Sequence, residues 1–316
     1  MKVGVVYKDK RSWVNRDIEL LKKHYDVEEY DYKNKKNHEI KNFVKNNDVI
    51  VNWFASLHSL NSTRYGKKFG KKIVTISGGY DISLLKGYGL PTSIKTRWIP
   101  KYILSRSDKI IAFSQFAKKE IHELIPNKEV QVSFGMDTEK FTPTTEKKKP
   151  VVLTVAYIDI VSWWRKGIDR FVSVAREYNK KGSDVIFKVV GKIDSSVQEK
   201  IDVFDEIENL YFVGFLSDEE LLKEYRQAKI YAQFSRHEGF GCSVAEAMLC
   251  NCIPVVSRIG SLPEVVGENG VYVEDNEQFG NAIDKALSLN FDEQRKWIAE
   301  NFSIKEHEKK LVESCK

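Results

Sequence analysis

The sequence lacks the features that mark membrane-spanning, secreted and metal-binding chains. No uninterrupted run of about 18 apolar residues occurs, so no membrane span is expected. The four cysteines do not have metal-site spacing, and Cys250 and Cys252 are separated by a single residue. We therefore expect free buried thiols in a reducing cytoplasm, and no metal site. The first residues, 1–7, read as a strand and not as a signal peptide.

Internal sequence repeats are not visible, and low-complexity tracts are absent apart from clusters of lysine. What the chain does have is length and apolar content. Its 316 residues suffice for two domains of ordinary size, and 42% of them are hydrophobic. We therefore expect two folded domains with real cores rather than a disordered chain.

Positive charge is concentrated in the first half of the chain. Residues 1–150 contain 30 Lys and Arg against 17 Asp and Glu, whereas the remainder contains 21 against 28. This asymmetry has two interpretations: a solvated lysine-rich surface, or a face that meets an anionic partner. The anionic partners that fit are a phospholipid surface, a lipid phosphate or nucleic acid.

Apolar runs alternate with helical segments through the first half, which predicts a parallel sheet covered on both faces. Strands are expected at 2–7, 27–32, 48–53, 72–76, 109–113 and 129–133. Helices are expected at 14–25, 38–46, 59–69, 94–105 and 115–124. Ser114 is a good N-cap for the last helix.

Residues 134–150 contain two prolines, a glycine and a lysine run, and they are the best candidate for an interdomain linker. A second series follows, with strands expected at 151–156, 185–190, 210–213, 230–234, 253–257 and 270–273. Its helices are expected at 167–178, 195–204, 218–227, 242–249, 276–289, 290–301 and 304–315. The fold class is therefore α/β, with two tandem Rossmann-like doubly wound domains, 1–145 and 146–302, facing a cleft. Ligands are expected at the carboxyl ends of the strands.

The stretch 236–248 combines a strand end, a glycine-bearing turn and a helix N-terminus. Free N–H groups and the positive end of the helix dipole gather at such a place, which suits a phosphate or a sugar hydroxyl. Gly239 and Gly241 allow a ligand to approach the backbone closely. Glu238 and Glu246 bracket the turn, and both could face one ligand lying across it.

Other strand ends carry further candidates in the second half. Arg165 and Lys166 place two cations next to a helix N-terminus, which predicts a diphosphate site, unless they are only surface charges. Gly191 and the run Gly214-Phe215-Leu216 also follow strands. This run would hold a nucleobase through backbone groups and an apolar face, or it is ordinary turn chemistry.

The first half has two candidate regions. Gly78, Gly79 and Asp81 follow a strand, and Asp81 either orients a sugar hydroxyl or acts as a base, or it only completes a turn. Residues 86–102 mix Lys and Arg with Trp and Tyr. Such a stretch faces a membrane or a charged acceptor, or it contains an amphipathic helix that packs on its own domain.

Several of these motifs together resemble one known family. The spacing of Glu238 and Glu246 within 235–248 resembles the donor signature of retaining GT-B glycosyltransferases of the large "group 1", or family-four, class. Residues 135–143 resemble the linker of that family, and residues 165–167 its diphosphate site. The segment 262–266 resembles the loop after its signature helix.

The resemblance implies transfer from a nucleotide-diphosphate sugar with retention of configuration, with no metal and no cofactor besides this co-substrate. Glu238 would contact sugar hydroxyls and Glu246 the ribose, while Lys166 with Arg165 would hold the diphosphate and stabilise the leaving group. The remaining donor-binding candidates are Gly239, Phe240, Gly241, Cys242, Ser243, Gly191, Gly214, Phe215 and Leu216. Gly78, Gly79 and Asp81 would lie on the acceptor side.

The same resemblance makes 1–145 the acceptor-side domain and 146–302 the donor domain, with the terminal helix, 303–316, crossing back to the first. The acceptor that best fits the basic half is a glycan, a lipid-linked sugar or another anionic molecule. A cytoplasmic protein with peripheral contact to an anionic inner membrane face is expected, and modified nucleic acid is the alternative acceptor. A nucleotide-sugar epimerase or hydrolase on the same fold, or a binding protein without turnover, are the other functions that fit.

Overall fold

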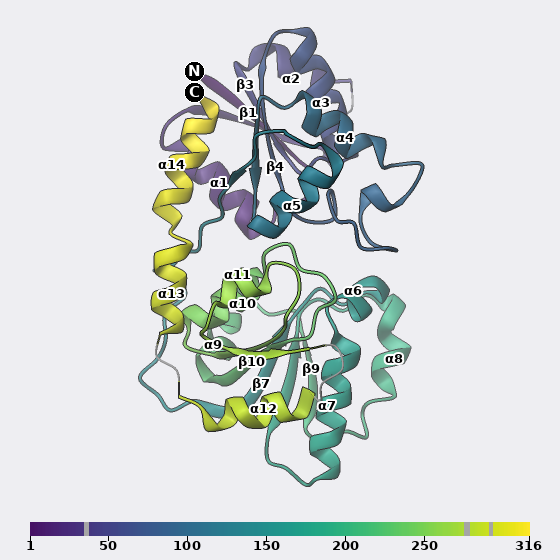
Figure 1. The fold of residues 1–316 in the computed structure, drawn as a ribbon, viewed down its shortest axis with the longest axis vertical. Coiled ribbons are helices and arrows are strands. Elements are labelled where there is room, and N and C mark those ends of the chain that lie inside the picture. Colours follow the sequence, from purple (N-terminus) through teal and green to yellow (C-terminus); the bar gives the residue numbers. More distant parts are fainter. Residues whose placement is uncertain (35–37, 275–278, 291–292) are drawn as a thin grey trace. The chain divides into compact units, whose positions relative to one another are not determined.

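The computed structural model describes residues 1–34, 38–274, 279–290 and 293–316. The chain folds into two compact units, which can be followed by colour in Figure 1. Unit 1 consists of Met1–Gly135 together with Ile304–Lys316, and unit 2 consists of Met136–Ser303. Among the described residues, no helix combines the length and the apolar character needed to cross a membrane.

Unit 1 is built on a six-stranded parallel sheet with the strand order β2-β1-β3-β4-β5-β6. The strands are β1 (Lys2–Tyr7), β2 (Asp26–Asp31), β3 (Val49–Trp53), β4 (Lys72–Ser77), β5 (Lys109–Ala112) and β6 (Gln131–Val132). The helices are α1 (Ser12–Lys22), α2 (Ile40–Asn46), α3 (Leu57–Lys68), α4 (Trp98–Arg106), α5 (Gln115–Leu124) and α14 (Ile304–Cys315), with a 3-10 turn at Leu90–Thr92. The central strands are buried on both faces, which is why they read as continuous apolar runs.

Unit 2 also has a six-stranded parallel sheet, with the order β12-β11-β10-β7-β8-β9. Its strands are β7 (Lys149–Val155), β8 (Ile186–Val190), β9 (Leu210–Gly214), β10 (Ala228–Gln233), β11 (Ile253–Ser257) and β12 (Val271–Val273). Its helices are α6 (Ile160–Arg165), α7 (Ile168–Lys180), α8 (Gln198–Asp202), α9 (Asp218–Gln227), α10 (Cys242–Leu249), α11 (Leu262–Val266), α12 (Phe279–Ser288) and α13 (Gln294–Asn301), with a 3-10 turn at Ser195–Val197. Two doubly wound parallel sheets were predicted, and this fold class is confirmed.

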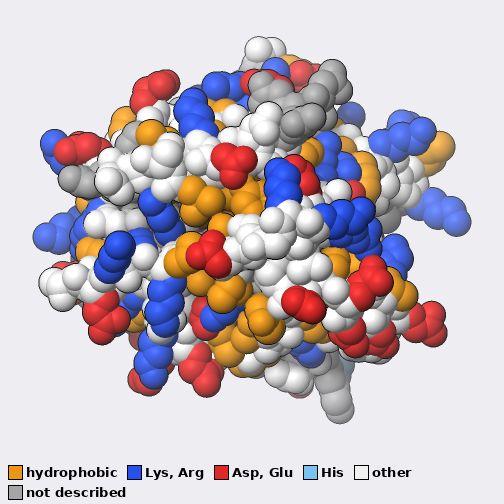
Figure 2. Space-filling model, turned by 90° about the horizontal axis from the view of Figure 1, so that it is seen from below, with side chains coloured by type: hydrophobic (Ala, Val, Ile, Leu, Met, Phe, Trp, Pro, Cys, Tyr) orange, Lys and Arg blue, Asp and Glu red, His pale blue; other side chains and the backbone are white. Residues whose placement is uncertain are grey.

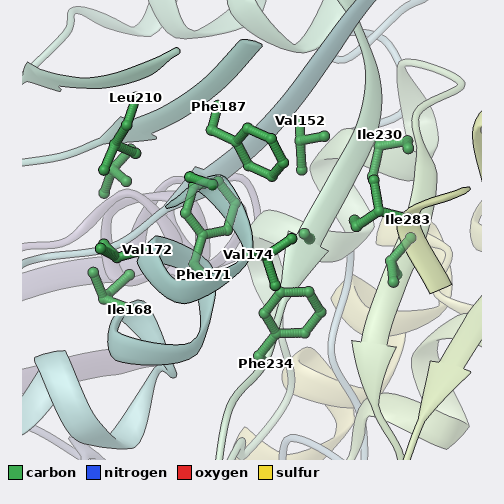
Figure 3. Close-up of a cluster of buried hydrophobic side chains, with 14 of the residues drawn as sticks. Val152, Ile168, Phe171, Val172, Val174, Phe187, Leu210, Ile230, Phe234 and Ile283 are labelled. Atoms are coloured by element: carbon green, nitrogen blue, oxygen red, sulfur yellow. The ribbon is translucent and has the colours of Figure 1, made fainter. Parts of the chain in front are cut away.

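The core of unit 2 lies between the sheet and the helices α7 and α12. Figure 3 shows Phe171 and Val174 of α7 turned toward Phe187 and Val152 on the strands. The rings of Phe171 and Phe187 meet edge to face with their centroids 5.5 Å apart. This packing fixes β7 and β10 at the centre of the sheet, and their carboxyl ends carry the candidate site.

Two helices differ from the predicted ones where a glycine or a proline intervenes. The predicted helix at 167–178 is preceded by a separate short helix, α6, because Gly167 adopts φ +71° between the two. A Cβ at Gly167 would lie 2.0 Å from the carbonyl oxygen of Phe234, so only glycine fits there. The helix expected at 94–105 begins at Trp98, after the 3-10 turn that contains Pro91.

The start of the helix expected at 276–289 and the start of the one at 290–301 lie outside the described residues. The described parts of these segments form α12 and α13. The helix α5 has the predicted bounds, and the Ser114 side chain accepts a hydrogen bond from the Ala117 N–H at 3.0 Å. The N-cap predicted at Ser114 is therefore confirmed.

The units divide after Gly135, earlier in the chain than the expected boundary at 145. The residues that follow Gly135 belong to unit 2 because its side chains hold them. The Arg226 side chain donates to the Thr142 carbonyl at 2.9 Å, and Arg295 donates to the Phe141 carbonyl at 2.5 Å. The proline-bearing stretch is therefore packed against unit 2 rather than extended as a free linker.

The terminal helix α14 is part of unit 1, where a buried polar cluster holds it. His307 on α14 lies between Asp17 of α1, at 3.0 Å, and the hydroxyl of Ser133, at 2.8 Å. Arg16 also donates to the Asp17 carboxylate, at 2.8 Å. Burial would raise the pKa of Asp17, but His307 and Arg16 lower it below its usual value.

Candidate active site

The candidate site lies where the strand order of the unit 2 sheet reverses direction. β7 and β10 are hydrogen-bonded neighbours, and the chain leaves β7 toward β8 and leaves β10 toward β11 on the opposite side. In open α/β sheets the crevice at the carboxyl ends of two such strands is where ligands bind. Lys166 follows β7 and Glu238 follows β10, so the topology brings the two motifs predicted from the sequence to one place.

The centre of the site is an ion pair between Lys166 and Glu238. The Lys166 side chain is 19% exposed and that of Glu238 is 11% exposed, so both are largely out of water. Gln233, at the end of β10, donates to the same carboxylate oxygen of Glu238 at 2.6 Å. The pair therefore joins the end of α6 to the loop after β10, and Gln233 ties the carboxylate to the end of β10.

Burial and charge act in opposite directions on this pair. Burial would raise the pKa of Glu238, but the cations Lys166 and Arg165 pull it below its usual value, so the carboxylate is ionised. Burial, helped by Arg165, lowers the pKa of Lys166 even though Glu238 opposes the shift. Two closely placed cations thus face one carboxylate. The net charge of these three side chains is positive, so a further anion can bind beside them.

The backbone that carries Glu238 is held from two sides. The Ser261 N–H and hydroxyl both donate to the Glu238 carbonyl, at 3.1 and 3.0 Å. Gly260, at φ +59°, allows this approach, since a Cβ there would lie 2.5 Å from the same carbonyl oxygen. The loop after β11 therefore positions the loop after β10.

Arg165 and Arg236 tie the two strand ends together. Arg165 donates to the His237 carbonyl at 3.4 Å, and the Arg236 N–H donates to the Arg165 carbonyl at 2.7 Å. The Arg236 guanidinium makes a bidentate pair with Asp169 at 2.9 and 2.8 Å. Arg236 is therefore committed to a structural pair, whereas Arg165 lies beside the ion pair of the site.

The N-terminus of α10 has no capping side chain. Gly241 occupies the N-cap at φ +98° and has no side chain with which to cap the helix. The first turn, which begins with Cys242 and Ser243, contains no acidic residue. The positive end of the helix dipole is therefore not offset by the helix's own sequence.

The N-terminus of α9, by contrast, is capped and acidic. Ser217 and Glu220 form a capping box, and three acidic residues fill the first turn. The two helices lie in the same unit, so the bare N-terminus of α10 is a local feature of the site.

Glu246 lies further along α10 and is held by a buried tyrosine. The Tyr225 hydroxyl donates to the Glu246 carboxylate at 2.9 Å. Burial, with the nearby Glu246 charge, raises the pKa of Tyr225 well above its usual value, so this hydroxyl keeps its proton. Tyr225, Gln233, Ser261 and the Arg236–Asp169 pair are supporting residues for which the sequence analysis assigned no role. Only the polar character of Gln233 and Tyr225 within apolar segments could have drawn attention to them.

Other predicted donor-loop residues have different surroundings. Phe240 is buried and its ring packs edge to face against Phe302, with 5.1 Å between centroids. Gly191 has φ +144°, and a Cβ there would lie 1.8 Å from the Ala156 carbonyl oxygen, so it lets the loops after β7 and β8 approach each other. Gly239 lies between Glu238 and Phe240 in the same loop.

The predicted nucleobase loop is not next to the ion pair in the sheet. Gly214 ends the edge strand β9 and Phe215 and Leu216 follow it, while β8 lies between β9 and β7. The Phe215 side chain is 77% exposed. The role of this loop in binding a base stays a prediction.

The acceptor-side candidates belong to unit 1. Asp81 is buried, and its carboxylate accepts from the Ala55 N–H at 2.8 Å, the Ser77 hydroxyl at 2.5 Å and the Gly79 N–H at 3.0 Å. These bonds are those of a turn that joins the ends of β3 and β4. Gly78 is also buried. A Cβ at this position would lie 2.3 Å from the Phe113 ring, so the glycine allows the two to pack closely.

Within the described ranges, no group of three or more His, Cys, Asp and Glu side chains is arranged to hold a metal ion. Cys250, Cys252 and Cys315 are buried free thiols, and Cys242 lies partly buried at the start of α10.

Comparison with known proteins identifies the part of the chain that carries this site. The profile of the family described as "Glycosyl transferases group 1" matches residues 135–303, which cover nearly all of unit 2. An uncharacterized glycosyltransferase of Methanocaldococcus jannaschii is 28% identical over 235 residues, which are 72% of this chain and 61% of the relative. N-acetyl-alpha-D-glucosaminyl L-malate synthase of Bacillus anthracis is 26% identical over 79% of this chain and 67% of its own length. The chain thus spans less than two thirds of the archaeal relative.

Solved structures show the same architecture over the whole chain. Anabaena HepE, in complex with UDP and glucose, matches with a TM-score of 0.76 and 16% identity over 99% of both chains. A sucrose-phosphate synthase from Thermosynechococcus elongatus matches with a TM-score of 0.78 and 15% identity over 99% of this chain and 98% of the other. At these identities the likeness establishes the fold, which is the predicted GT-B fold.

Proposed function

The chain belongs to the group 1 glycosyltransferases, whose profile matches more than half of its 316 residues, and we propose that it transfers a sugar from a nucleotide-diphosphate sugar with retention of configuration. The observation that carries this proposal is the buried Lys166–Glu238 pair at the switch point of the unit 2 sheet. A hydrolytic acid/base pair would need two carboxyl groups flanking one bond. Here a carboxylate is paired with a cation, beside a second cation and the α10 N-terminus.

The two cations and the helix N-terminus suit the diphosphate of the donor. Cleavage of the anomeric bond develops negative charge on the departing phosphate, and fixed positive groups stabilise it most effectively in a site sheltered from water. Lys166, Arg165 and the N–H groups of Cys242 and Ser243 are the proposed donors. They would supply this charge without a metal ion, which is the part of the proposal that a chelator tests.

The carboxylates are proposed to bind the two sugars of the donor. Glu238 is ionised and rigidly held, so it is suited to accept hydrogen bonds from hydroxyls of the transferred sugar and to face the positive charge that develops on it. Glu246 is oriented by Tyr225 and is the proposed acceptor for ribose hydroxyls. When the donor binds, its diphosphate would compete with Glu238 for Lys166.

An anionic acceptor is proposed to bind unit 1. Unit 1 holds 30 Lys and Arg against 17 Asp and Glu, whereas unit 2 holds 21 against 28. The names of two relatives contain an anionic molecule: L-malate in the Bacillus anthracis enzyme, and phosphatidylinositol in an Arabidopsis thaliana N-acetylglucosaminyltransferase subunit that is 26% identical over 65% of this chain. A glycan, lipid-linked or small anionic acceptor therefore fits best.

A panel of nucleotide sugars tests the proposal. We expect one of UDP-glucose, UDP-N-acetylglucosamine or a related donor to raise the melting temperature, since a ligand that binds only the folded state stabilises it. Glu238→Gln keeps the shape of the side chain but removes the negative charge that competes with the diphosphate for Lys166. It should therefore bind free UDP at least as tightly as the wild type, while transfer of the sugar falls by about two orders of magnitude.

Two results would contradict this function. If Glu238→Gln transferred sugar at the wild-type rate, the carboxylate would not face the donor sugar. If the wild type released free nucleotide at the same rate with and without any acceptor, the protein would be a nucleotide-sugar hydrolase on the same fold.

A further inference from the structure

A separate feature of unit 1 is the segment between Asp81 and Asp108, which lies between β4 and β5 and contains α4. This segment contains five cations, Lys86, Lys95, Arg97, Lys101 and Arg106, and no Asp or Glu. On the face shown in Figure 2, by contrast, Lys and Arg side chains are interspersed with Asp and Glu side chains. The segment therefore carries ionised side chains of one sign only, unlike the face shown in Figure 2.

The same segment exposes large apolar side chains. In the described part of unit 1, the exposed large hydrophobic residues are Met1, Leu57, Tyr80, Leu84, Ile94 and Trp98. Four of these six lie between positions 80 and 98. Ile94 is 81% exposed and Trp98 49%. Such side chains are costly to leave in water, and their clustering marks an interaction surface.

The packing of α4 does not explain this exposure. Ile99, Ile103 and Leu104 form the inner face of α4 and are buried in a cluster with residues of the sheet. These residues account for the packing of the expected amphipathic helix on its own domain. Ile94 and Trp98 are not part of that buried face: Ile94 precedes the helix, and Trp98 is its first residue.

The exposed loop is held in place by its own hydrogen bonds. The Leu90 N–H donates to the Tyr80 carbonyl at 2.9 Å, and the Thr96 hydroxyl donates to the Leu90 carbonyl at 2.8 Å. The Trp98 indole N–H donates to the Lys95 carbonyl at 3.1 Å. The polar edge of the indole is therefore satisfied locally, and the remainder of the ring is an apolar surface.

Four cations of this segment form no ion pair with a carboxylate among the residues that the structure describes: Lys86, Lys95, Arg97 and Lys101. Each keeps its charge available to an external anion. An exposed tryptophan and an isoleucine between lysines and an arginine are the pattern of a surface that rests in the headgroup region of a bilayer.

We propose that residues 84–101, which we call the α4 loop, form a surface that binds membranes containing anionic lipids. Ile94 and Trp98 enter the boundary between headgroups and acyl chains, and Lys95, Arg97 and Lys101 contact lipid phosphates. A nucleic acid would pair with the cations but would leave Ile94 and Leu84 exposed to water, so a bilayer fits the combination better. The proposal depends on unit 1 alone and does not require the transfer reaction.

Vesicle co-sedimentation tests the proposal without donor or acceptor. The wild type should bind phosphatidylcholine vesicles that contain phosphatidylglycerol, and binding should weaken with added salt. Lys95→Glu/Arg97→Glu should reduce this binding by roughly twentyfold or more, because each cation near the surface contributes about 1 kcal/mol. The matched control, Lys41→Glu/Lys45→Glu on α2, changes the net charge of unit 1 equally at exposed positions and should bind as the wild type does.

Apolar substitutions separate membrane contact from simple charge attraction. Ile94→Ser should weaken binding several-fold, whereas Val203→Ser, at another exposed apolar position in unit 2, should not. Tryptophan emission should shift to shorter wavelength on vesicle binding, and the shift should be lost in Trp98→Phe, which still binds. Because these side chains are exposed, unchanged melting temperatures would show that the variants are folded.

Three results would overturn the proposal. One is equal binding to pure phosphatidylcholine vesicles and to those with phosphatidylglycerol. Another is equal loss of binding in the α2 control and in the α4-loop variant. The third is binding to duplex DNA at least as tight as to vesicles, with no effect of Ile94→Ser on either, which would assign the surface to nucleic acid.

Discussion

Two buried carboxylates at the carboxyl ends of strands have opposite electrostatic character. Asp81 of unit 1 accepts hydrogen bonds from two N–H groups and a hydroxyl, and burial raises its pKa above the usual value. Glu238 of unit 2 is equally sheltered, but Lys166 and Arg165 lower its pKa. Both sheets are doubly wound and parallel, so the difference comes from the cations that the neighbouring loop supplies.

The two carboxylates also differ in where their partners come from. The donors to Asp81 come from the end of β4 and the turn after it, and from Ala55 in the loop after β3. The partners of Glu238 come from β10 and from the loop after β7, which are far apart in the sequence. A sheet with a switch point thus offers a place for a ligand, and in unit 2 the loops after two strands also bring opposite charges together there.

The largest expected effect follows from removing the cation at the unit 2 switch point. Lys166→Ala should lower kcat by about two to three orders of magnitude, because a positioned donor to the developing charge is lost. Lys166→Arg should recover part of the rate. Steady-state transfer assays measure both, and donor-free melting shows whether the variant is folded.

Lys8→Ala is the matched control, since Lys8 directly follows the central strand β1 of unit 1 and is exposed. It should leave nucleotide-sugar binding unchanged. If Lys8→Ala weakened donor binding as much as Lys166→Ala does, the assignment of the donor to unit 2 would be wrong.

A third buried carboxylate, Asp17, extends the comparison to stability. Asp17→Asn leaves His307 and Arg16 without their charged partner and should lower the free energy of unfolding of unit 1 by about 3 kcal/mol at neutral pH. The pKa of Asp17 is lower in the folded state, so its contribution is present above the unfolded pKa of about 4 and is lost as the pH falls through the folded value. The difference between wild type and variant should therefore shrink on acidification.

Hydrogen exchange of peptides from α1 and α14, after partial unfolding in urea at several pH values, measures this difference locally. If the difference in free energy of unfolding between wild type and Asp17→Asn grew as the pH fell, the pKa of Asp17 would not be lowered in the folded state.

A smaller effect is expected from the residue that orients Glu246. Tyr225→Phe removes a hydrogen bond to a charged group, which is worth about 1.5 kcal/mol or more, and should raise the KM for the nucleotide sugar by about tenfold. Tyr178→Phe is the control, because Tyr178 also donates to a carboxylate, that of Asp284, but lies between α7 and α12. An equal rise in KM for both variants would show that only general stability had changed.

The smallest effect is expected from removing metal ions. If Lys166, Arg165 and the α10 N-terminus neutralise the diphosphate, transfer in excess chelator should proceed at the rate measured without it. A loss of activity that Mg²⁺ or Mn²⁺ restored would show that these groups do not suffice.

Much of this fold could be predicted because the strands are buried on both faces and so read as apolar runs. β1, β11, α5, α9, α10 and α14 have the predicted bounds. The prediction was less accurate where a single residue sets the path of the chain, as at Gly167, whose positive φ creates the separate helix α6. Propensity does not reveal such a conformation, because the close approach to Phe234 depends on another strand.

The candidate site was predicted in part for the same reason. Glu238, Glu246, Arg165 and Lys166 stand out by charge beside glycines at strand ends. Their supports do not, since Gln233, Tyr225 and Ser261 look like ordinary polar residues until the fold places them against the carboxylates or their backbone.

The sequence by itself determined which segments form strands and helices, where glycines open a turn and where charge of one sign gathers, because these depend on neighbouring residues. Only the tertiary structure decided that Lys166 meets Glu238 while Asp81 meets only neutral donors. It also decided that Ile94 and Trp98 stay exposed while Ile99 is buried. These outcomes depend on which elements pack together, and the free energy of a buried charge or an exposed apolar side chain is set by that packing.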